Sequence, residues 1–393
     1  MGVKCVENEK ENSSQNDIQE IDEIEEPTQK EKKKVSKWVI AIIIILVSLL
    51  VIFAVLVFSA VAYIKTNFKY NYNEITSNPE ELGFEEVIEE KNINIALFGI
   101  DSREKGSFTG RSDSIMILNV NTKTNQIKLI SVMRDTMVPI QRKNRTSYIK
   151  LNSAYATGGP EFAIKTLNTT FGLDISEYAT VNFEGMADII DQVGGIEAEI
   201  TKNEINYINV AIEEQVTKYG GNPEDYKISE SGHIHLNGIQ AVAYSRIRYV
   251  ANSEGVANDY GRTDRQRYVL NQLFNKVKFL EKENYIELIK AMLPHCETSL
   301  SYTEILDIAL GVMLESPTLL ETRVPDTTYT MRAPSTNLGS IVYYDLNFAA
   351  KLIHGFIYDG IKPEDYIAAN GIEQNDWYTN GYTSPVFEKR SQK

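Results

Sequence analysis

The stretch that decides the expected fold contains three short apolar runs that end in charged residues: "NINIALFGID" (92–101), "SDSIMILNVN" (112–121) and "QIKLISVMRD" (126–135). Apolar residues alternate in the first run at Ile93, Ile95 and Leu97, which indicates a strand. The turn at Asn121–Asn125 predicts that the second and third strands form an antiparallel hairpin. We expect the first strand to run parallel to the third.

This arrangement gathers charged groups at one end of the sheet. The hairpin places Asp113, at the start of the second strand, beside Arg134, at the end of the third. A parallel first strand adds Asp101, and Arg111 lies close to Asp113 in the chain. Ligands of open α/β sheets bind at the carboxyl ends of the strands. Two aspartates beside arginines suit Mg²⁺ on a pyrophosphate, with Mn²⁺ as an alternative, although structural ion pairs show the same pattern.

The rest of the exported chain alternates strands and helices, which favours one α/β domain. Further elements are expected as a strand at "IEAEI" (196–200) and as helices at Pro160–Leu167, 183–195, Asp264–Lys282, Tyr302–Leu314 and Asp345–Tyr358.

Arginines are concentrated in "YSRIRYVANSEGVANDYGRTDRQR" (244–267), although the chain has a net charge of −14. Arg246 and Arg248 are two apart in a strand-like stretch and are expected to share a face. Thr263 and Gln266 match a capping box, so a helix is predicted to begin near Thr263 and to favour an anion there. Arginine grips phosphate in a bidentate manner, while surface ion pairs with nearby carboxylates are the alternative interpretation.

An uncharged run from Trp38 to Ile64 predicts a membrane anchor. As a helix it would span roughly 40 Å, more than the hydrocarbon layer of ~30 Å. Lys32, Lys33, Lys34 and Lys37 precede it, so the amino terminus is expected in the cytoplasm and the following chain outside the cell. The chain is therefore expected to be a single-pass protein of the cell membrane.

The expected organisation has five parts: a disordered cytoplasmic tail (1–37), the anchor (38–64), a stalk (65–90), the main domain (91–365) and a C-terminal tail (366–393). The exported part is acidic, which argues against bulk nucleic-acid binding. Cys5 and Cys296 fall on opposite sides of the membrane and cannot pair. His233 and His235 lack a third ligand and are interpreted as exposed residues of a strand.

Seven ordered motifs resemble the LytR-CpsA-Psr family of bacterial cell-envelope enzymes, closely over residues 91–285: "FGIDSR", "GRSDSIMI", "ISVMRDTMV", "KLNSAYATGG", "VGGIEAEI", "LNGIQAVAYSRIRY" and "DYGRTDRQRYVL". The resemblance implies an α-β-α sandwich with a central mixed sheet, in a host of the Gram-positive type. It also implies a phosphotransferase that moves a teichoic-acid or capsule-type glycopolymer from polyprenyl pyrophosphate to peptidoglycan, at the C6 hydroxyl of N-acetylmuramic acid.

The resemblance also implies roles for individual residues. Asp101 and Asp113 would hold Mg²⁺. Arg134 and Arg246 would act in catalysis, with Asp259 as the candidate base. The remaining phosphate ligands would be Arg111, Arg248, Arg262, Arg265 and Gln266. Met133 departs from the family, which usually has proline there.

Two other functions fit the same residues. A non-catalytic receptor for polyprenyl phosphate, acting as an envelope sensor or transcriptional attenuator, would need the arginines but not the aspartates. A lipid pyrophosphatase would use water in place of the sugar hydroxyl. The identity of the polymer, the oligomeric state and a lipid tunnel between the helices stay open at this point.

Overall fold

The computed structural model describes residues 51, 55 and 70–371, with gaps at 90, 103–105, 122, 125, 144, 282–283, 316 and 327–328. The predicted anchor therefore lies outside the described residues, apart from Val51 and Val55, and so do the tail 1–37 and residues 372–393. Among the described residues, no helix combines the length and the hydrophobicity that a bilayer-crossing segment needs.

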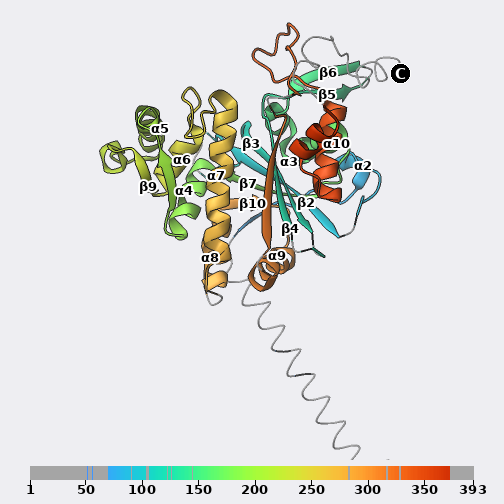
Figure 1. The fold of residues 1–393 in the computed structure, drawn as a ribbon. Coiled ribbons are helices and arrows are strands. Elements are labelled where there is room, and N and C mark those ends of the chain that lie inside the picture. The colour runs from blue at the N-terminus through green and yellow to red at the C-terminus, as the bar shows by residue number, and fades with distance from the viewer. Residues whose placement is uncertain are drawn as a thin grey trace, which may run out of the picture. The chain divides into compact units, whose positions relative to one another are not determined.

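A mixed seven-stranded sheet forms the centre of the domain (Figure 1). Its order is β1-β10-β7-β2-β3-β4-β11. The strands are β1 (Asn71–Tyr72), β2 (Asn92–Ile100), β3 (Ser112–Asn121), β4 (Gln126–Val132), β7 (Glu177–Asn182), β10 (Cys296–Thr298) and β11 (Thr318–Val324). Two small antiparallel pairs accompany it, β5 (Met137–Arg142) with β6 (Arg145–Lys150), and β8 (Ile196–Ile200) with β9 (Gly232–Leu236).

The predicted course of the first three strands is confirmed. β2 pairs antiparallel with β3, and β3 pairs antiparallel with β4, so β2 and β4 run in the same direction. β7 and β11 are parallel to them. Four strands therefore present their carboxyl ends at one edge of the sheet.

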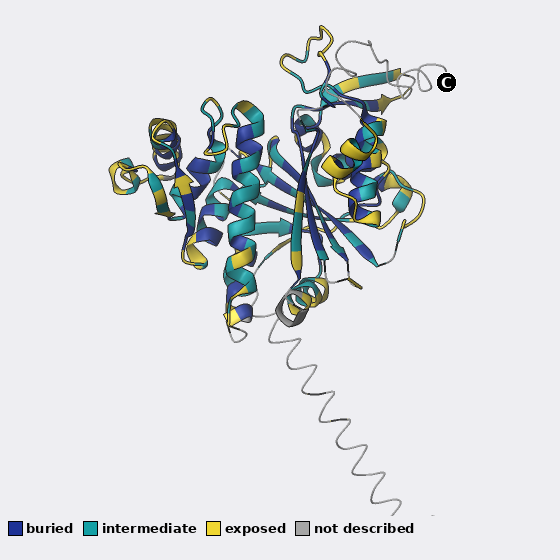
Figure 2. Cartoon of the chain, viewed as in Figure 1, coloured by how far each residue is buried: buried dark blue, intermediate teal, exposed yellow. Residues whose placement is uncertain are grey.

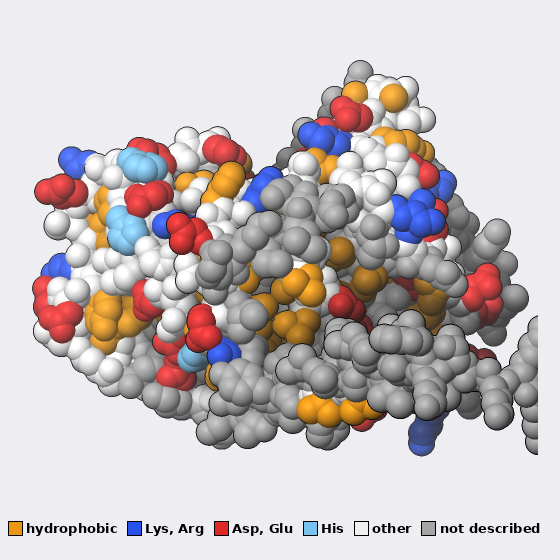
Figure 3. Space-filling view, turned by 90° about the horizontal axis from the view of Figure 1, so that it is seen from below, with side chains coloured by type: hydrophobic (Ala, Val, Ile, Leu, Met, Phe, Trp, Pro, Cys, Tyr) orange, Lys and Arg blue, Asp and Glu red, His pale blue; other side chains and the backbone are white. Residues whose placement is uncertain are grey.

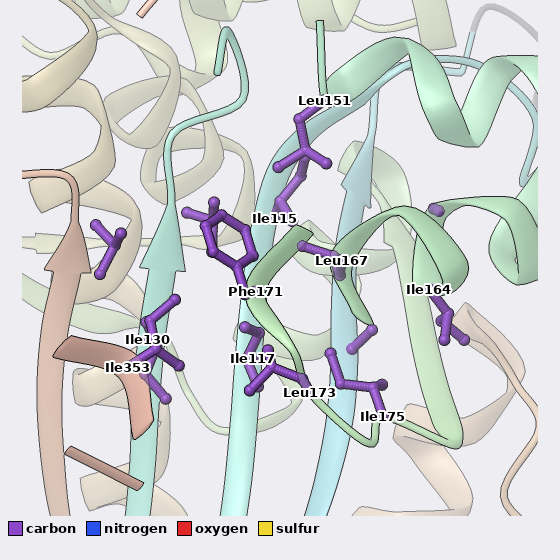
Figure 4. Packing of buried hydrophobic residues seen from close by; sticks show 14 of the residues in the cluster. Ile115, Ile117, Ile130, Leu151, Ile164, Leu167, Phe171, Leu173, Ile175 and Ile353 are labelled. Carbon is purple, nitrogen blue, oxygen red and sulfur yellow. The ribbon is translucent and has the colours of Figure 1, made fainter. Parts of the chain in front are cut away.

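Hydrophobic side chains hold helices on one face of this sheet (Figure 4). Ile115 and Ile117 are two residues apart in β3, so they point to the same face, where Leu167 and Phe171 of α3 pack. Ile95 of β2 points to the opposite face and is also buried, which shows that the other face of the sheet is covered as well (Figure 2). The structure confirms a mixed α/β fold around a central mixed sheet.

The helices are α2 (Pro79–Leu82), α3 (Asn152–Phe171), α4 (Phe183–Gln192), α5 (Glu204–Tyr219), α6 (Gly238–Arg246), α7 (Asn258–Lys278), α8 (Tyr285–Met292), α9 (Tyr302–Glu315), α10 (Leu346–His354) and α11 (Pro363–Ala369). A second hydrophobic cluster joins α4, α5, α6 and α7 to the β8–β9 pair. Pro160 begins the second half of α3, because Gly158 and Gly159 interrupt the helical conformation just before it.

The structure corrects the predicted start of α7. The helix begins at Asn258, not near Thr263. The side chain of Asn252 accepts hydrogen bonds from the N–H groups of Glu254 and Val256 and closes a turn. This turn ends just before Asn258, so the helix begins five residues earlier than Thr263. The Thr263 hydroxyl donates to the carbonyl of Asp259, as a residue inside a helix does.

Residues 70–89, assigned to a stalk from the sequence, pack on the domain. β1 pairs with β10 at the sheet edge, and Leu82 of α2 is buried in the first hydrophobic cluster.

His233 and His235 are exposed side chains of strand β9, in agreement with the sequence interpretation. His235 pairs with Glu197 of the facing strand, and histidine side chains lie beside acidic ones on the face shown in Figure 3.

A buried ion pair fastens α7 to α5. Arg265 and Glu204 have no exposed side-chain surface, and Arg265 Nη2 lies 2.7 Å from Glu204 Oε1. The other carboxylate oxygen of Glu204 accepts from the N–H and the hydroxyl of Thr201, each at 2.8 Å. The carboxylate is thus fully engaged.

We predict that Glu204→Gln lowers the free energy of unfolding by about 3–5 kcal/mol, because it leaves a buried guanidinium without its counter-charge. Glu224→Gln removes an exposed pair with Lys227 and should change it by less than ~1 kcal/mol. Urea denaturation of both variants measures the difference. Equal stabilities would show that the buried pair contributes nothing.

Candidate active site

The site begins with an irregularity in the β2–β3 ladder. Gly99 pairs with Ser114, but the next residue, Ile100, pairs with Ser112, so the ladder skips Asp113. Such bulges re-aim a side chain and are frequent beside active sites. Asp101 directly follows β2 at the same edge. Of the two predicted metal-binding aspartates, Asp113 therefore lies at the bulge in β3, and Asp101 lies in the loop that follows the adjacent strand β2.

Arg134 connects this edge to α7. It is the second residue after β4, and its side chain is only 8% exposed. Its Nη1 lies 2.5 Å from Asp113 Oδ1, and its Nη2 lies 3.6 Å from Asp259 Oδ1. One guanidinium group therefore bridges a carboxylate of the sheet and a carboxylate of the helix.

Asp259 collects two more arginines. Arg262 Nη2 is 2.9 Å from Asp259 Oδ1, and Arg248 Nε is 3.8 Å from the same oxygen. Because Asp259 lies in the first turn of α7, the helix dipole also favours its negative charge. Three guanidinium groups from separate parts of the chain thus surround one carboxylate.

A contact through Thr263 joins α7 to the end of β4. The Thr263 hydroxyl lies 3.4 Å from the sulfur of Met133, the residue that departs from the family pattern. The Met133 N–H donates to the carbonyl of Val324, a bond that proline cannot make. Arg134 keeps its place in the site with methionine before it.

A second group of contacts positions Arg246 and Asp101. Arg246 lies 3.3 Å from Glu214, and its guanidinium stacks 4.6 Å from the centre of the Phe183 ring. Lys218 lies 3.6 Å from Asp101 and also donates to the carbonyl of Ser102. Glu214 and Lys218 are one turn apart on α5, so this helix links Arg246 to Asp101.

The site carries more positive than negative charge, although the chain as a whole is acidic. Its contacting cationic side chains are Arg134, Lys150, Lys218, Arg246, Arg248 and Arg262, and its carboxylates are Asp101, Asp113, Asp135, Glu214 and Asp259. Burial lowers the pKa of Arg262 to about 10, opposed by Asp259, so Arg262 stays charged at neutral pH.

Two donor groups in this cluster have no acceptor. The Nε atoms of Arg134 and Arg262 are buried and make no hydrogen bond within the described part of the chain. Buried donors without partners are costly and call for an explanation. Arg134 Nε faces Asp135 Oδ2 at 3.6 Å, which is beyond hydrogen-bond distance.

Most of the predicted site residues are connected by these contacts, and three need a separate statement. Arg111 is exposed at the start of β3, and Gln266 is half-buried two turns after Asp259 on α7. Arg265, predicted as a phosphate ligand, is not positioned for that role, because it is buried against Glu204 and donates to the carbonyls of Ile247 and Val250. It holds the arginine-bearing loop in place.

The predicted strand around Arg246 and Arg248 is also corrected. Arg246 ends α6, and Arg248 follows in a loop, so alternation along a strand does not align them. Sequence reasoning missed Phe183, Glu214 and Lys218. The one available signal was the i, i+4 spacing of Glu214 and Lys218, typical of an exposed helical ion pair.

The carboxylates of Asp101 and Asp113 are the type of ligand that a magnesium ion prefers. Mg²⁺ takes one or two carboxylates and completes its shell with phosphate oxygens and water. Asp101 is half-exposed, and Asp113 is held on one side by Arg134. Among the described residues, no group of three or more His, Cys, Asp or Glu side chains could hold a metal ion.

The chain is similar in sequence to curated bacterial proteins. A curated relative in Bacillus anthracis, "Polyisoprenyl-teichoic acid--peptidoglycan teichoic acid transferase TagU", is 32% identical over 225 residues, 57% of this chain and 66% of that protein. The protein of the same name in Enterococcus faecalis is 34% identical over 222 residues, 56% of this chain and 65% of that protein. The matches thus span just under two thirds of these relatives.

Solved structures and the family model extend the likeness. The crystal structure of protein gbs0355 from Streptococcus agalactiae is 27% identical, with a TM-score of 0.54 over 71% of this chain and 95% of that one. The model of the LytR_cpsA_psr family matches residues 57–347, most of the chain and all of the site described above. The protein belongs to the LytR-CpsA-Psr family.

Proposed function

We propose that this protein is a phosphotransferase that moves a glycopolymer of the teichoic-acid or capsule type from polyprenyl pyrophosphate to peptidoglycan. The acceptor would be the C6 hydroxyl of N-acetylmuramic acid. The single observation that supports this most strongly is the cluster around Asp259, where three guanidinium groups meet at the carboxyl edge of the sheet beside two aspartates. The names of the curated relatives support the same substrate class.

The arginines would supply the main electrostatic contribution. Phosphoryl transfer depends on positioned positive charge, because charge builds on the leaving phosphate. Asp259 and Asp113 gather Arg134, Arg248 and Arg262 before phosphates arrive. Arg246 is fixed independently by Phe183 and Glu214 and would act from the other side of the cluster.

Asp259 is suited to a second role as the base. Its carboxylate and the phosphates of a substrate compete for the same guanidinium groups. Substrate binding would therefore loosen the ion pairs of Asp259 and leave an oxygen able to accept the proton of the acceptor hydroxyl. Asp101 and Asp113 would hold Mg²⁺, or Mn²⁺, which when bound adds charge neutralisation on the pyrophosphate.

The proposed location is the outer face of the cell membrane. The apolar run 38–64 and the lysines before it support a single-pass anchor with the domain outside the cell. A lipid-linked substrate and the peptidoglycan acceptor would both be within reach there. The acidic balance of the exported part argues against nucleic acid as a partner.

Supplying lipid-pyrophosphate-linked glycopolymer with and without a muramyl acceptor separates the three candidate functions. The transferase couples polymer to the acceptor and needs it for turnover. A pyrophosphatase releases phosphate without the acceptor, and a receptor binds the lipid without turnover. Coupled product that depends on the acceptor is the expected result. Its absence with the folded, full-length protein would contradict the proposal.

We predict that Arg246→Ala lowers the transfer rate by about two orders of magnitude, because it removes one positive charge from the leaving phosphate. Arg142→Ala provides the matched control, since Arg142 is exposed on β5 and outside the cluster. Steady-state transfer measures both. The catalytic assignment of Arg246 would be wrong if the two variants, shown to be folded, had the same rate.

Asp101→Asn should raise the Mg²⁺ concentration needed for half-maximal activity by about tenfold or more, because the amide lacks the charge that binds the ion. Chelation should abolish transfer in the unmodified protein, and either Mg²⁺ or Mn²⁺ should restore it. A metal titration of transfer activity measures this. An unchanged titration curve would show that Asp101 does not hold the ion.

Asp259→Asn should slow transfer by about two orders of magnitude yet tighten the binding of lipid pyrophosphate. Removing its charge leaves Arg134, Arg248 and Arg262 with less internal competition for phosphate. Equilibrium binding and single-turnover kinetics on the same preparation measure the two effects. Weaker binding together with slower transfer would indicate that Asp259 only organises the arginines.

A further inference from the structure

A cavity of about 450 Å³ lies at the edge of the sheet, outside the arginine cluster. It is formed between α7, β11 and α11, and its walls include Arg267, Glu321, Arg323, Asp326, Glu364 and Ile367. None of these residues belongs to the site assigned above. The cavity is large enough for a short peptide or a sugar with its substituents.

The cavity follows an open edge of the sheet. β11 is the last strand, and in the described part of the chain no other strand pairs with its outer side. The carbonyl of Val324 accepts the Met133 N–H, so the backbone groups of Val324 face β4. Alternation then turns the backbone N–H and C=O groups of Glu321 and Arg323 outward. An extended peptide can add to such an edge.

The cations of the cavity are fixed in its depth. Arg267 lies 2.7 Å and Arg323 lies 2.5 Å from the same oxygen of Asp264. Arg323 also stacks 4.8 Å from the centre of the Tyr260 ring, and its side chain is only 10% exposed. The Nε atoms of both arginines are buried without a hydrogen-bond partner in the described structure. Arg323 Nη2 also lies 3.7 Å from Asp326, so both guanidinium groups are already paired with carboxylates of the protein, Asp264 and Asp326.

Carboxylates occupy the outer wall. Glu321 and Glu364 are exposed where the cavity opens, and Ile367 adds an apolar surface beside them. A negatively charged ligand would be repelled at this rim, and the arginines beneath it are already paired with Asp264 and Asp326. The charge pattern therefore suits a ligand with an ammonium group.

The cavity adjoins the proposed base. Arg323 Nη1 lies 3.4 Å from the carbonyl of Tyr260, the residue that follows Asp259. β11 and β4 are neighbours, so the carboxyl end of β11 lies about 5 Å from the strand that carries Arg134. Arg323 thus links the lining of the cavity to the backbone next to Asp259.

We propose that this cavity binds a short extended peptide that bears an ammonium group, through the open edge of β11 and the carboxylates of Glu321 and Glu364. Resting on the proposed function, we identify the peptide as the stem of the peptidoglycan acceptor, which carries carboxylates and the ammonium group of a diamino acid. The cavity would then select acceptor strands with intact stems and place their muramyl hydroxyl at Asp259.

The test measures binding of soluble acceptors to the full-length protein in detergent micelles by isothermal titration calorimetry. The ligands are N-acetylmuramic acid with a stem peptide that contains a diamino acid, and the same sugar without the peptide. We expect the peptide-bearing ligand to bind at least about tenfold more tightly. The double variant Glu321→Lys and Glu364→Lys should lose that advantage, while Glu224→Lys, an exposed charge reversal elsewhere, should keep it.

The result that overturns the inference is equal affinity for the two ligands, or a peptide advantage that the double variant retains. The transfer assay keeps this failure distinct from failure of the proposed function. If transfer proceeds but the peptide is not recognised, only the cavity assignment is wrong. If transfer is absent while peptide binding depends on Glu321 and Glu364, the peptide site stands and the transferase proposal falls.

Discussion

The site depends on the ion pairs of one carboxylate. Asp259, in the first turn of α7, lies beside the guanidinium groups of Arg134, Arg248 and Arg262, which come from the end of β4, a loop and the same helix. Without this negative charge, three buried or half-buried cations would repel one another at short range. The carboxylate therefore organises the positive cluster, which in the proposed mechanism it would release to the phosphates of the substrate. Asp259 thus has a structural role in the arginine cluster as well as its proposed role as the base.

The three arginines of α7, Arg262, Arg265 and Arg267, have three different structural roles. Arg262 and Arg265 are three residues apart on neighbouring positions of the helix surface, and Arg267 points away from both, yet each of the three has a different partner. Arg262 joins the cluster at Asp259, Arg265 is buried against Glu204, and Arg267 lines the cavity at the edge of β11. An acidic protein thus concentrates arginine where a helix lies between a charged site, a hydrophobic core and a polar cavity.

Local patterns were sufficient to predict the central strands and the convergence of Asp113 with Arg134, because alternation and a short turn determine that hairpin. They were not sufficient for α7, whose early start depends on the Asn252 turn, or for Arg265, whose partner lies 61 residues away. Phe183, Glu214 and Lys218 were missed because their importance comes from what packs beside them. The role of the β11 edge required the order of strands in the sheet, which no local pattern contains.

The most direct measurement is a crystal structure of the protein with a short-chain polyprenyl pyrophosphate. The account predicts that both phosphates lie within hydrogen-bond distance, about 3 Å, of guanidinium groups from Arg134, Arg248 and Arg262, with Asp101 and Asp113 on the metal side. It also predicts that Asp259 moves away from at least one of its arginines. A pyrophosphate bound apart from all three arginines, for example against Arg267 and Arg323, would contradict it.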